Sequence, residues 1–92
     1  MDFEWDETKN ASNRIKHEVG FEVMGRFDWE RSSVRTDNRQ DYGEVRFLAY
    51  GPIDGLGLHV VAFTMRGNKY RIISLRPFGR KDHRYYEPPY SG

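Results

Sequence analysis

The sequence predicts a single α+β domain in which N-terminal helices pack on an antiparallel sheet of about four strands, followed by a short C-terminal helix. Three observations predict this class. The chain has 92 residues, enough for one hydrophobic core but not for a second domain. A run of good helix formers near the N-terminus ends at Gly20, and alternating apolar and polar residues begin after Arg31. Residues 1–92 are therefore expected to form one domain.

The two N-terminal helices are predicted within residues 7–27. Asp2 to Trp5 is interpreted as a short edge strand, and Asp6 as the N-cap of a helix from Glu7 to His17. This helix is polar almost all round, so its buried side is expected to be a thin apolar stripe of Ala11, Ile15 and Val19. A second short helix is predicted by large apolar side chains that recur at a spacing of three: Phe21, Met24 and Phe27.

The strands are predicted in the second part of the chain. Four runs there are alternating or strongly apolar: residues 32–36, 44–50, 58–66 and 69–76. Residues 51–57 are rich in glycine and proline and are interpreted as a loop, and Gly67-Asn68 as a tight hairpin turn. Pro77 ends the last strand because it lacks the N–H that a ladder needs. Residues 80–86 are expected to form the short C-terminal helix.

The composition is that of a small folded protein without disulfides. Hydrophobic residues make up 37% of the chain and aromatic residues 15%, which argues for a packed core despite 32% charged residues. The absence of cysteine excludes thiolate chemistry and favours a reducing compartment, so a cytoplasmic location is expected. The acidic N-terminus predicts no signal peptide, and no stretch approaches the ~20 apolar residues of a membrane helix, so no membrane partner is expected.

Positive charge is concentrated in the C-terminal half. Residues 47–92 carry seven basic and three acidic side chains, whereas residues 1–46 carry eight basic and eleven acidic ones. Between Arg66 and Arg84, seven basic residues are accompanied only by Asp82. Arginine outnumbers lysine by 11 to 4, and its planar guanidinium suits phosphate contacts. This segment is either a nucleic-acid surface or a solvated basic face.

Three groups of residues resemble the motifs of the BrnT toxins, in that family's order and over nearly the whole chain. The first is Phe3-Glu4-Trp5-Asp6 with Lys9-Asn10, Asn13, Lys16-His17 and Phe21. The second is Asp37, Arg39, Asp41-Tyr42-Gly43-Glu44 and Arg46. The third is Arg71-Ile72-Ile73-Ser74-Leu75-Arg76 with Tyr86. The chain differs from the usual pattern at Pro77-Phe78-Gly79, where the family has small residues, and at Asp82, where it has glutamate.

The resemblance implies a ribonuclease with a RelE-like fold that acts as the toxin of a type II toxin–antitoxin pair. Such a toxin acts on RNA and is neutralised by a BrnA-type antitoxin, and promoter DNA is bound only through the complex of the two. Two other functions remain open on the sequence. The basic surface fits a non-catalytic RNA-binding module as well, and it fits a subunit that only docks the antitoxin.

RNA cleavage without a metal needs a base for the ribose 2′-OH, cations that stabilise the phosphorane, and an acid for the leaving 5′-oxygen. No metal or other cofactor is expected, because the chain has no cysteine and its three histidines and its acids lack metal-ligand spacing. With the resemblance, the catalytic residues are expected to be Lys16, His17, Glu44, Arg46, Arg76 and Tyr86. The RNA-binding residues are expected to be Arg71, Ser74, Arg80, Lys81 and Arg84.

Several of these residues also have a structural interpretation. His17 is either a general acid or base, or a cap on the last carbonyls of its helix. Glu44 and Arg46 are either a carboxylate base beside a phosphate-binding guanidinium, or a surface ion pair. His59 is interpreted as structural and His83 as a surface residue. The tyrosines near the basic segment either stack on bases or pack against the sheet: Tyr85, Tyr86 and Tyr90.

Arg71 and Arg76 have opposite parity on one strand, so a regular strand places them on opposite faces of the sheet. Either one arginine is structural, or Pro77 distorts the strand end. Arg76 is the expected transition-state residue, because a strand end favours an open cleft. Arg71 is then available to hold an acidic partner.

Overall fold

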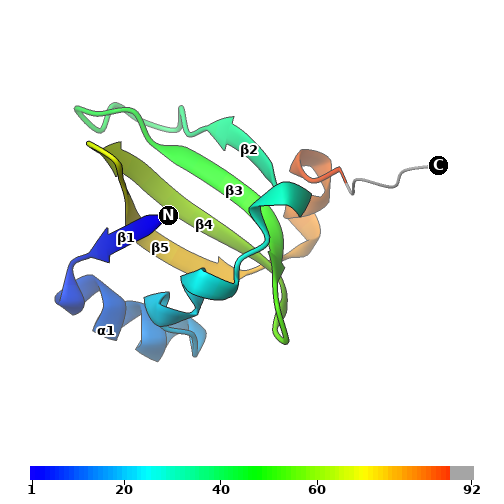
Figure 1. The fold of residues 1–92 in the computed structure, drawn as a ribbon. Helices are drawn as coiled ribbons and strands as arrows, with labels where there is room; N and C mark the ends of the chain where they lie inside the picture. The colour runs from blue at the N-terminus through cyan, green and yellow to red at the C-terminus, as the bar shows by residue number, and fades with distance from the viewer. Residues whose placement is uncertain (88–92) are drawn as a thin grey trace.

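The computed structural model describes residues 1–87 and contains one five-stranded sheet with the strand order β1-β5-β4-β3-β2 (Figure 1). The pairing of β1 with β5 is parallel, and the other pairings are antiparallel. The elements, with 3-10 helices written η, are β1 (Asp2–Trp5), α1 (Glu7–His17), η1 (Phe21–Arg26), η2 (Trp29–Arg31), β2 (Ser33–Thr36), β3 (Phe47–Ile53), β4 (Gly57–Arg66), β5 (Lys69–Pro77) and η3 (Arg80–Tyr85).

The α+β class is confirmed, but the sheet differs from the predicted one. It has five strands rather than about four antiparallel ones, because the N-terminal strand joins β5 in parallel. The predicted strand number and the RelE-like description are therefore not matched by this sheet. The predicted second helix and C-terminal helix are the 3-10 helices η1 and η3, so α1 is the one α-helix within residues 1–87.

The two faces of the sheet carry separate apolar clusters. The helical face lies under η1 and η2, which cross in front of the sheet in Figure 1, and its buried cluster consists of Val19, Phe21, Met24, Phe27, Ala49, Ile53, Val61, Phe63, Ile72 and Leu75. The opposite face, which we call the open face, has a smaller buried cluster of Leu48, Tyr50, Val60 and Ala62. Within the described residues, the open face is covered by η3 and the segments next to it, through Phe78, Tyr85 and Tyr86.

Strand β3 extends into the segment predicted as a loop. Gly51, Pro52 and Ile53 pair with β4. Pro52 fits here because β2 begins at the level of Tyr50, so no neighbouring strand on that side requires the missing N–H. Gly51 is required by space, since a Cβ atom at this position would lie 2.9 Å from the Cβ atom of Ser32.

Helix α1 buries polar residues in place of the predicted apolar stripe. Asp6 caps it as predicted, accepting hydrogen bonds from two N–H groups of the first turn. Ile15 is 85% exposed, whereas Asn10 and Asn13 are buried. The Asn13 amide accepts from the N–H of Leu75 at 3.0 Å and donates to its carbonyl at 2.7 Å, as a neighbouring strand does. The stripe prediction was wrong for Ala11 and Ile15, which are exposed, although Val19 just beyond the helix is buried as predicted. Helix α1 covers the edge of β5 beyond β1, where backbone groups need polar partners.

A β-bulge in β5 decides which of its side chains share a face. The register with β4 slips by one residue, which leaves Ile73 as the extra residue. Ile72 and Leu75 consequently both lie in the cluster of the helical face. Arg71 and Arg76 therefore both lie on the open face, although a regular strand would place them on opposite faces. The strand is distorted, but at Ile73 and not at Pro77, where the sequence had suggested a distortion. A bulge changes the alternation by one residue, and the sequence of β5 gives no separate sign of it.

Candidate active site

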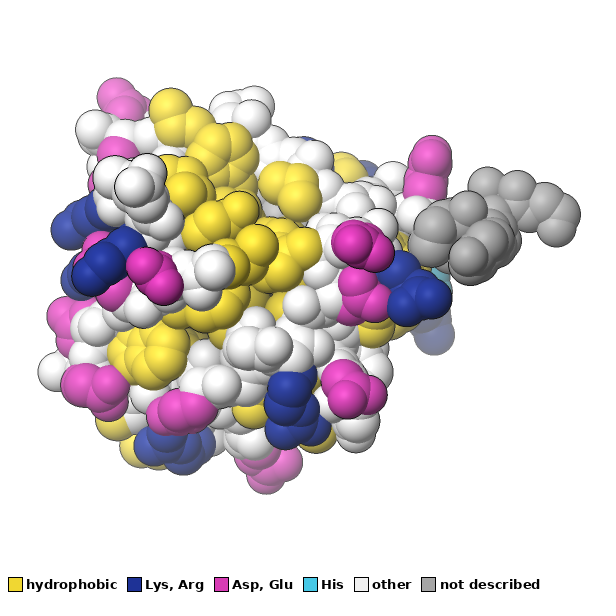
Figure 2. All heavy atoms as spheres, in the orientation of Figure 1, with side chains coloured by type: hydrophobic (Ala, Val, Ile, Leu, Met, Phe, Trp, Pro, Cys, Tyr) yellow, Lys and Arg dark blue, Asp and Glu magenta, His cyan; other side chains and the backbone are white. Residues whose placement is uncertain are grey.

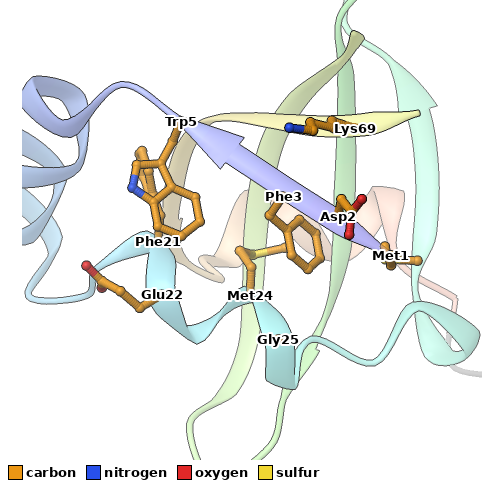
Figure 3. A pocket seen from close by; sticks show the side chains of 9 residues that line it. All are labelled: Met1, Asp2, Phe3, Trp5, Phe21, Glu22, Met24, Gly25 and Lys69. Atoms are coloured by element: carbon orange, nitrogen blue, oxygen red, sulfur yellow. The ribbon is translucent and has the colours of Figure 1, made fainter. Parts of the chain in front are cut away.

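Most of the predicted site residues lie on the open face or at its margins. They form three groups, at the C-terminal end of α1, at the end of β5 with η3, and in the loop before β3. None of these groups borders the hollow of about 510 Å³ on the helical face, which Figure 3 shows from close by. That hollow is lined mainly by apolar side chains, with Phe3 against Met24 and Trp5 beside Phe21. Hydrophobic side chains also gather at the centre of this face in Figure 2.

The first group joins α1 to β5. Lys16 and His17 line a hollow of about 260 Å³ together with Ile73 and Ser74. Partial burial lowers the pKa of His17 below its ordinary value, and the positive charges of Lys16 and Arg76 lower it further. The His17 ring is therefore neutral at pH 7 and able to accept a proton. Ser74 pairs across the sheet with Ala62 of the open-face cluster, which places its side chain on the same face as Arg76.

The second group is an ion pair that fixes η3. Arg76 donates from Nη1 to Oδ2 of Asp82 at 2.7 Å and from Nη2 to Oδ1 at 2.9 Å. Asp82, only 5% exposed, also accepts the N–H of Gly79 at 2.7 Å. The Arg76 guanidinium is the main cause that lowers the pKa of Asp82, so this carboxylate stays ionised at neutral pH. Asp82 and the segment Pro77-Phe78-Gly79 therefore shape the turn into η3. These are the positions at which the chain differs from the motif pattern described above.

A basic pocket of about 250 Å³ lies between η3 and strands β2 and β3. We call it the arginine pocket, and its lining residues are Arg35, Arg39, Leu48, Tyr50, Arg76, Lys81, Asp82, Arg84 and Tyr85. Of the RNA-binding residues predicted on η3, Lys81 and Arg84 line this pocket, whereas Arg80 is exposed outside its lining. Arg35 and Arg39 also line this pocket, although neither was among the predicted site residues. The sequence signal for Arg35 was the polar alternation of residues 32–36, which does not say which face an arginine takes. The signal for Arg39 was its place in the central motif.

The third group lies at the other end of the open face. The Glu44 carboxylate is 3.9 Å from Nε of Arg46 and 3.6 Å from Nη2 of Arg66. Arg71 has the acidic partner that the sequence allowed, since its Nη1 is 3.6 Å from Glu4. Arg71 and Arg76 pair with residues of β4 four positions apart, so they lie about 13 Å apart along the sheet. The predicted catalytic set is thus divided between two ends of one face.

Asp37 organises the loop that carries this third group. Its buried carboxylate accepts from Nε and Nη2 of Arg39 at 2.8 and 2.7 Å and from the Tyr42 hydroxyl at 3.1 Å. These partners, with Arg39 first, lower the pKa of Asp37 to about 2. The Asp37 N–H donates to the carbonyl of Arg46, whose guanidinium carbon lies 3.9 Å above the Tyr42 ring. The central motif therefore holds the loop together.

The remaining aromatic and histidine residues take mixed roles. Tyr86 is half-buried and its ring contacts that of Phe78 at 5.7 Å, so packing describes it better than free stacking. His59 is buried with Nδ1 3.0 Å from the carbonyl of Gly57, and His83 is exposed beside Phe78, as the sequence indicated. Tyr90 lies outside the described residues. Within residues 1–87, no three His, Cys, Asp or Glu side chains are grouped to hold a metal, and no helix is long and apolar enough to cross a membrane.

Comparisons with known proteins agree with the resemblance seen in the sequence. A family model described as the ribonuclease toxin BrnT of type II toxin–antitoxin systems matches residues 5–82. The 1.1 Å crystal structure of the Brucella abortus ribonuclease toxin BrnT matches with a TM-score of 0.65 and 27% identity, covering 87% of this chain and 99% of that one. No curated protein matches. The chain therefore belongs to the BrnT family of ribonuclease toxins of type II toxin–antitoxin systems.

Proposed function

We propose that this chain is an endoribonuclease that cleaves RNA without a metal ion and is held inactive by a BrnA-type antitoxin. Promoter DNA is contacted only through that toxin–antitoxin complex. The observation that carries the proposal is that Lys16, His17 and Ser74 line one hollow beside the bulge of β5. Arg76 lies two residues beyond Ser74 on the same face, and its charge helps to lower the pKa of His17. These residues come from two motifs that are distant in the sequence and typical of the family.

His17 is the proposed base for the ribose 2′-OH, because its lowered pKa keeps the ring neutral near pH 7. Arg76 stabilises the charge that develops on the phosphorane. Lys16 and Tyr86 are the groups available to protonate the leaving 5′-oxygen. At the far end of the face, Arg46 and Arg71 hold a neighbouring part of the RNA, with Glu44 as the group that orients Arg46 or serves as a second base. Arg80, Lys81 and Arg84 attract the RNA backbone.

The test is cleavage of RNA by the purified chain, with EDTA and without it. We expect cleavage in both conditions. For Arg76→Ala we expect the cleavage rate to fall by at least ~100-fold, because the variant lacks a donor that stabilises the transition state. The Glu44→Ala variant tests where the chemical step takes place. If its cleavage rate falls as much as that of Arg76→Ala, the catalytic centre lies at the Glu44 end of the face. No cleavage by the folded chain overturns the enzyme, and loss of cleavage with EDTA overturns metal independence.

A second function has one observation in its favour, namely that both Nη atoms of Arg76 are already bonded to Asp82. A guanidinium used in this way holds η3 and leaves less donor capacity for a transition state. That arrangement favours a non-catalytic RNA-binding module. The same assay distinguishes the two functions, since the module binds RNA in a salt-dependent way and never cleaves it.

A further inference from the structure

The cationic side chains of the arginine pocket fall into two classes. Arg39 and Arg76 are each paired with a buried carboxylate, that of Asp37 and that of Asp82. Three other cations of the same pocket form no ion pair with any residue of the described chain: Arg35, Lys81 and Arg84. The pocket therefore has an excess of positive charge that residues 1–87 leave uncompensated.

Arg35 is held in place by two tyrosines. Its Nε donates to the Tyr50 hydroxyl at 3.2 Å, and its guanidinium carbon lies 3.9 Å from the centroid of the Tyr85 ring. The Tyr50 and Tyr85 rings are themselves in contact, with centroids 5.4 Å apart. The hydrogen bond to Tyr50 is the main cause that raises the pKa of Arg35, so the group stays charged. These contacts fix the guanidinium plane through Nε and leave both Nη groups without a hydrogen bond inside the described chain.

A planar guanidinium with two free Nη groups matches two oxygens of a phosphate. Arg84 lies on the same ring, with its guanidinium carbon 5.6 Å from the Tyr85 centroid, and Lys81 lines the same pocket. Because the tyrosines already order Arg35, little side-chain entropy is lost when an anion binds. An orienting contact made by a neutral hydroxyl also leaves the full positive charge available to a ligand.

The position of Arg35 relates it to the proposed catalytic end of the face. Arg35 pairs with Leu48, Leu48 with Ala62, and Ala62 with Ser74, so Arg35 and Ser74 lie on one row across the sheet. Three strand spacings separate them, about 14 Å. A single RNA strand that crosses the sheet along this row reaches both within a few nucleotides.

We propose that Arg35, oriented by Tyr50 and Tyr85 and assisted by Lys81 and Arg84, binds one backbone phosphate of single-stranded RNA away from the scissile bond. The proposal rests on RNA as the substrate of the proposed function. Arg35 is here a binding and positioning residue, and its removal is expected to weaken substrate binding rather than the chemical step.

The test compares Arg35→Gln with Arg26→Gln. Arg26 is a matched control because it lies in η1, by the helical face, and its Nε and Nη2 donate to the backbone carbonyl of Asp54. The probe is a single-stranded RNA with 2′-O-methyl groups, which binds without being cleaved. For Arg35→Gln we expect the slope of log affinity against log salt to fall by about 0.7, the value for one lost phosphate contact on a single strand. For Arg26→Gln the slope stays that of the unmodified chain.

Cleavage kinetics and two further variants separate binding from folding. Arg35→Gln is expected to raise KM by about tenfold with little change in kcat, since the contact is made equally before and during the reaction. Tyr50→Phe keeps the ring and removes the orienting hydroxyl, so it is expected to raise KM less. Arg35→Lys keeps the charge and is expected to restore the salt slope but not the full affinity.

The outcomes distinguish this proposal from the proposed function. An unchanged salt slope and KM in Arg35→Gln overturn the phosphate site while cleavage by the unmodified chain stands. A changed slope in a chain that never cleaves RNA supports the site and rejects the enzyme. Inorganic phosphate is the second probe: if it displaces the RNA at equal concentration, the site takes free phosphate and the RNA assignment is wrong.

Discussion

The two faces of the sheet in this BrnT-family chain are built from different kinds of interaction. On the helical face, Trp29 contacts the rings of Phe27, Phe63 and Tyr70, with centroids 4.7 to 5.4 Å apart. On the open face, guanidinium groups lie against tyrosine rings and are bonded to buried carboxylates, as in the Arg76–Asp82 pair. The helical face holds ten of the buried apolar residues and the open face four. The difference indicates that stability comes mainly from one face and that the other is available for charged ligands.

The largest expected effect is on the helical face. Phe21 has no exposed surface, and Phe21→Ala is expected to lower the free energy of unfolding by about 3–5 kcal/mol, since a buried ring leaves a cavity. Urea unfolding measures it. On the open face, Phe78→Ala serves as the comparison because that ring is only half-buried, and a smaller loss is expected. An equal loss at both positions contradicts the inference that stability comes mainly from the helical face.

The next largest expected effect on stability is at the edge of β5, which α1 covers. Asn13→Ala removes both bonds to the backbone of Leu75 and is expected to cost about 2–3 kcal/mol, because a buried N–H and a buried carbonyl lose their partner. Ser12→Ala, an exposed neighbour on the same helix, is expected to change stability by less than about 0.5 kcal/mol. Thermal unfolding of the two variants provides the measurement. A similar stability in both shows that the edge needs no polar cover.

The loop of the third group gives a pH-dependent effect on the open face. The pKa of Asp37 is lowered from 3.8 to about 2, so its charge stabilises the fold fully above pH 4, and that contribution is lost as the pH falls through about 2. Asp37→Asn is therefore expected to cost about 2 kcal/mol at pH 7 and much less near pH 2. Unfolding free energies across this range measure it. Asp41→Asn, at an exposed position of the same loop, is the control, and a cost for Asp37→Asn that does not vary with pH contradicts the prediction.

The smallest expected effect concerns the exposed side of α1. Ile15→Lys is expected to change the free energy of unfolding by less than about 0.5 kcal/mol, because the side chain is 85% exposed. The same substitution at Val19, which is buried, is expected to be strongly destabilising and serves as the control. A large loss for Ile15→Lys points to a partner or fold contact on this side of α1.

The sequence was sufficient for the class, the family and several local elements. The Asp6 cap and the Gly67-Asn68 turn depend on neighbouring residues, so their local chemistry predicts them. The same holds for the family motifs, which are read residue by residue. The predicted site residues remain predictions, although the sequence did indicate that the active surface combines distant parts of the chain.

Tertiary structure decided the partners and the faces. Whether α1 buries Ile15 or Asn13 depends on what lies beneath it, and here that is an open strand edge rather than an apolar surface. The bulge at Ile73 brings Arg71 and Arg76 to one face through a register that β4 imposes. Arg35 meets the tyrosines only once β2, β3 and η3 have come together. Local chemistry acts between neighbours in the chain, whereas these contacts join residues that only folding brings within reach.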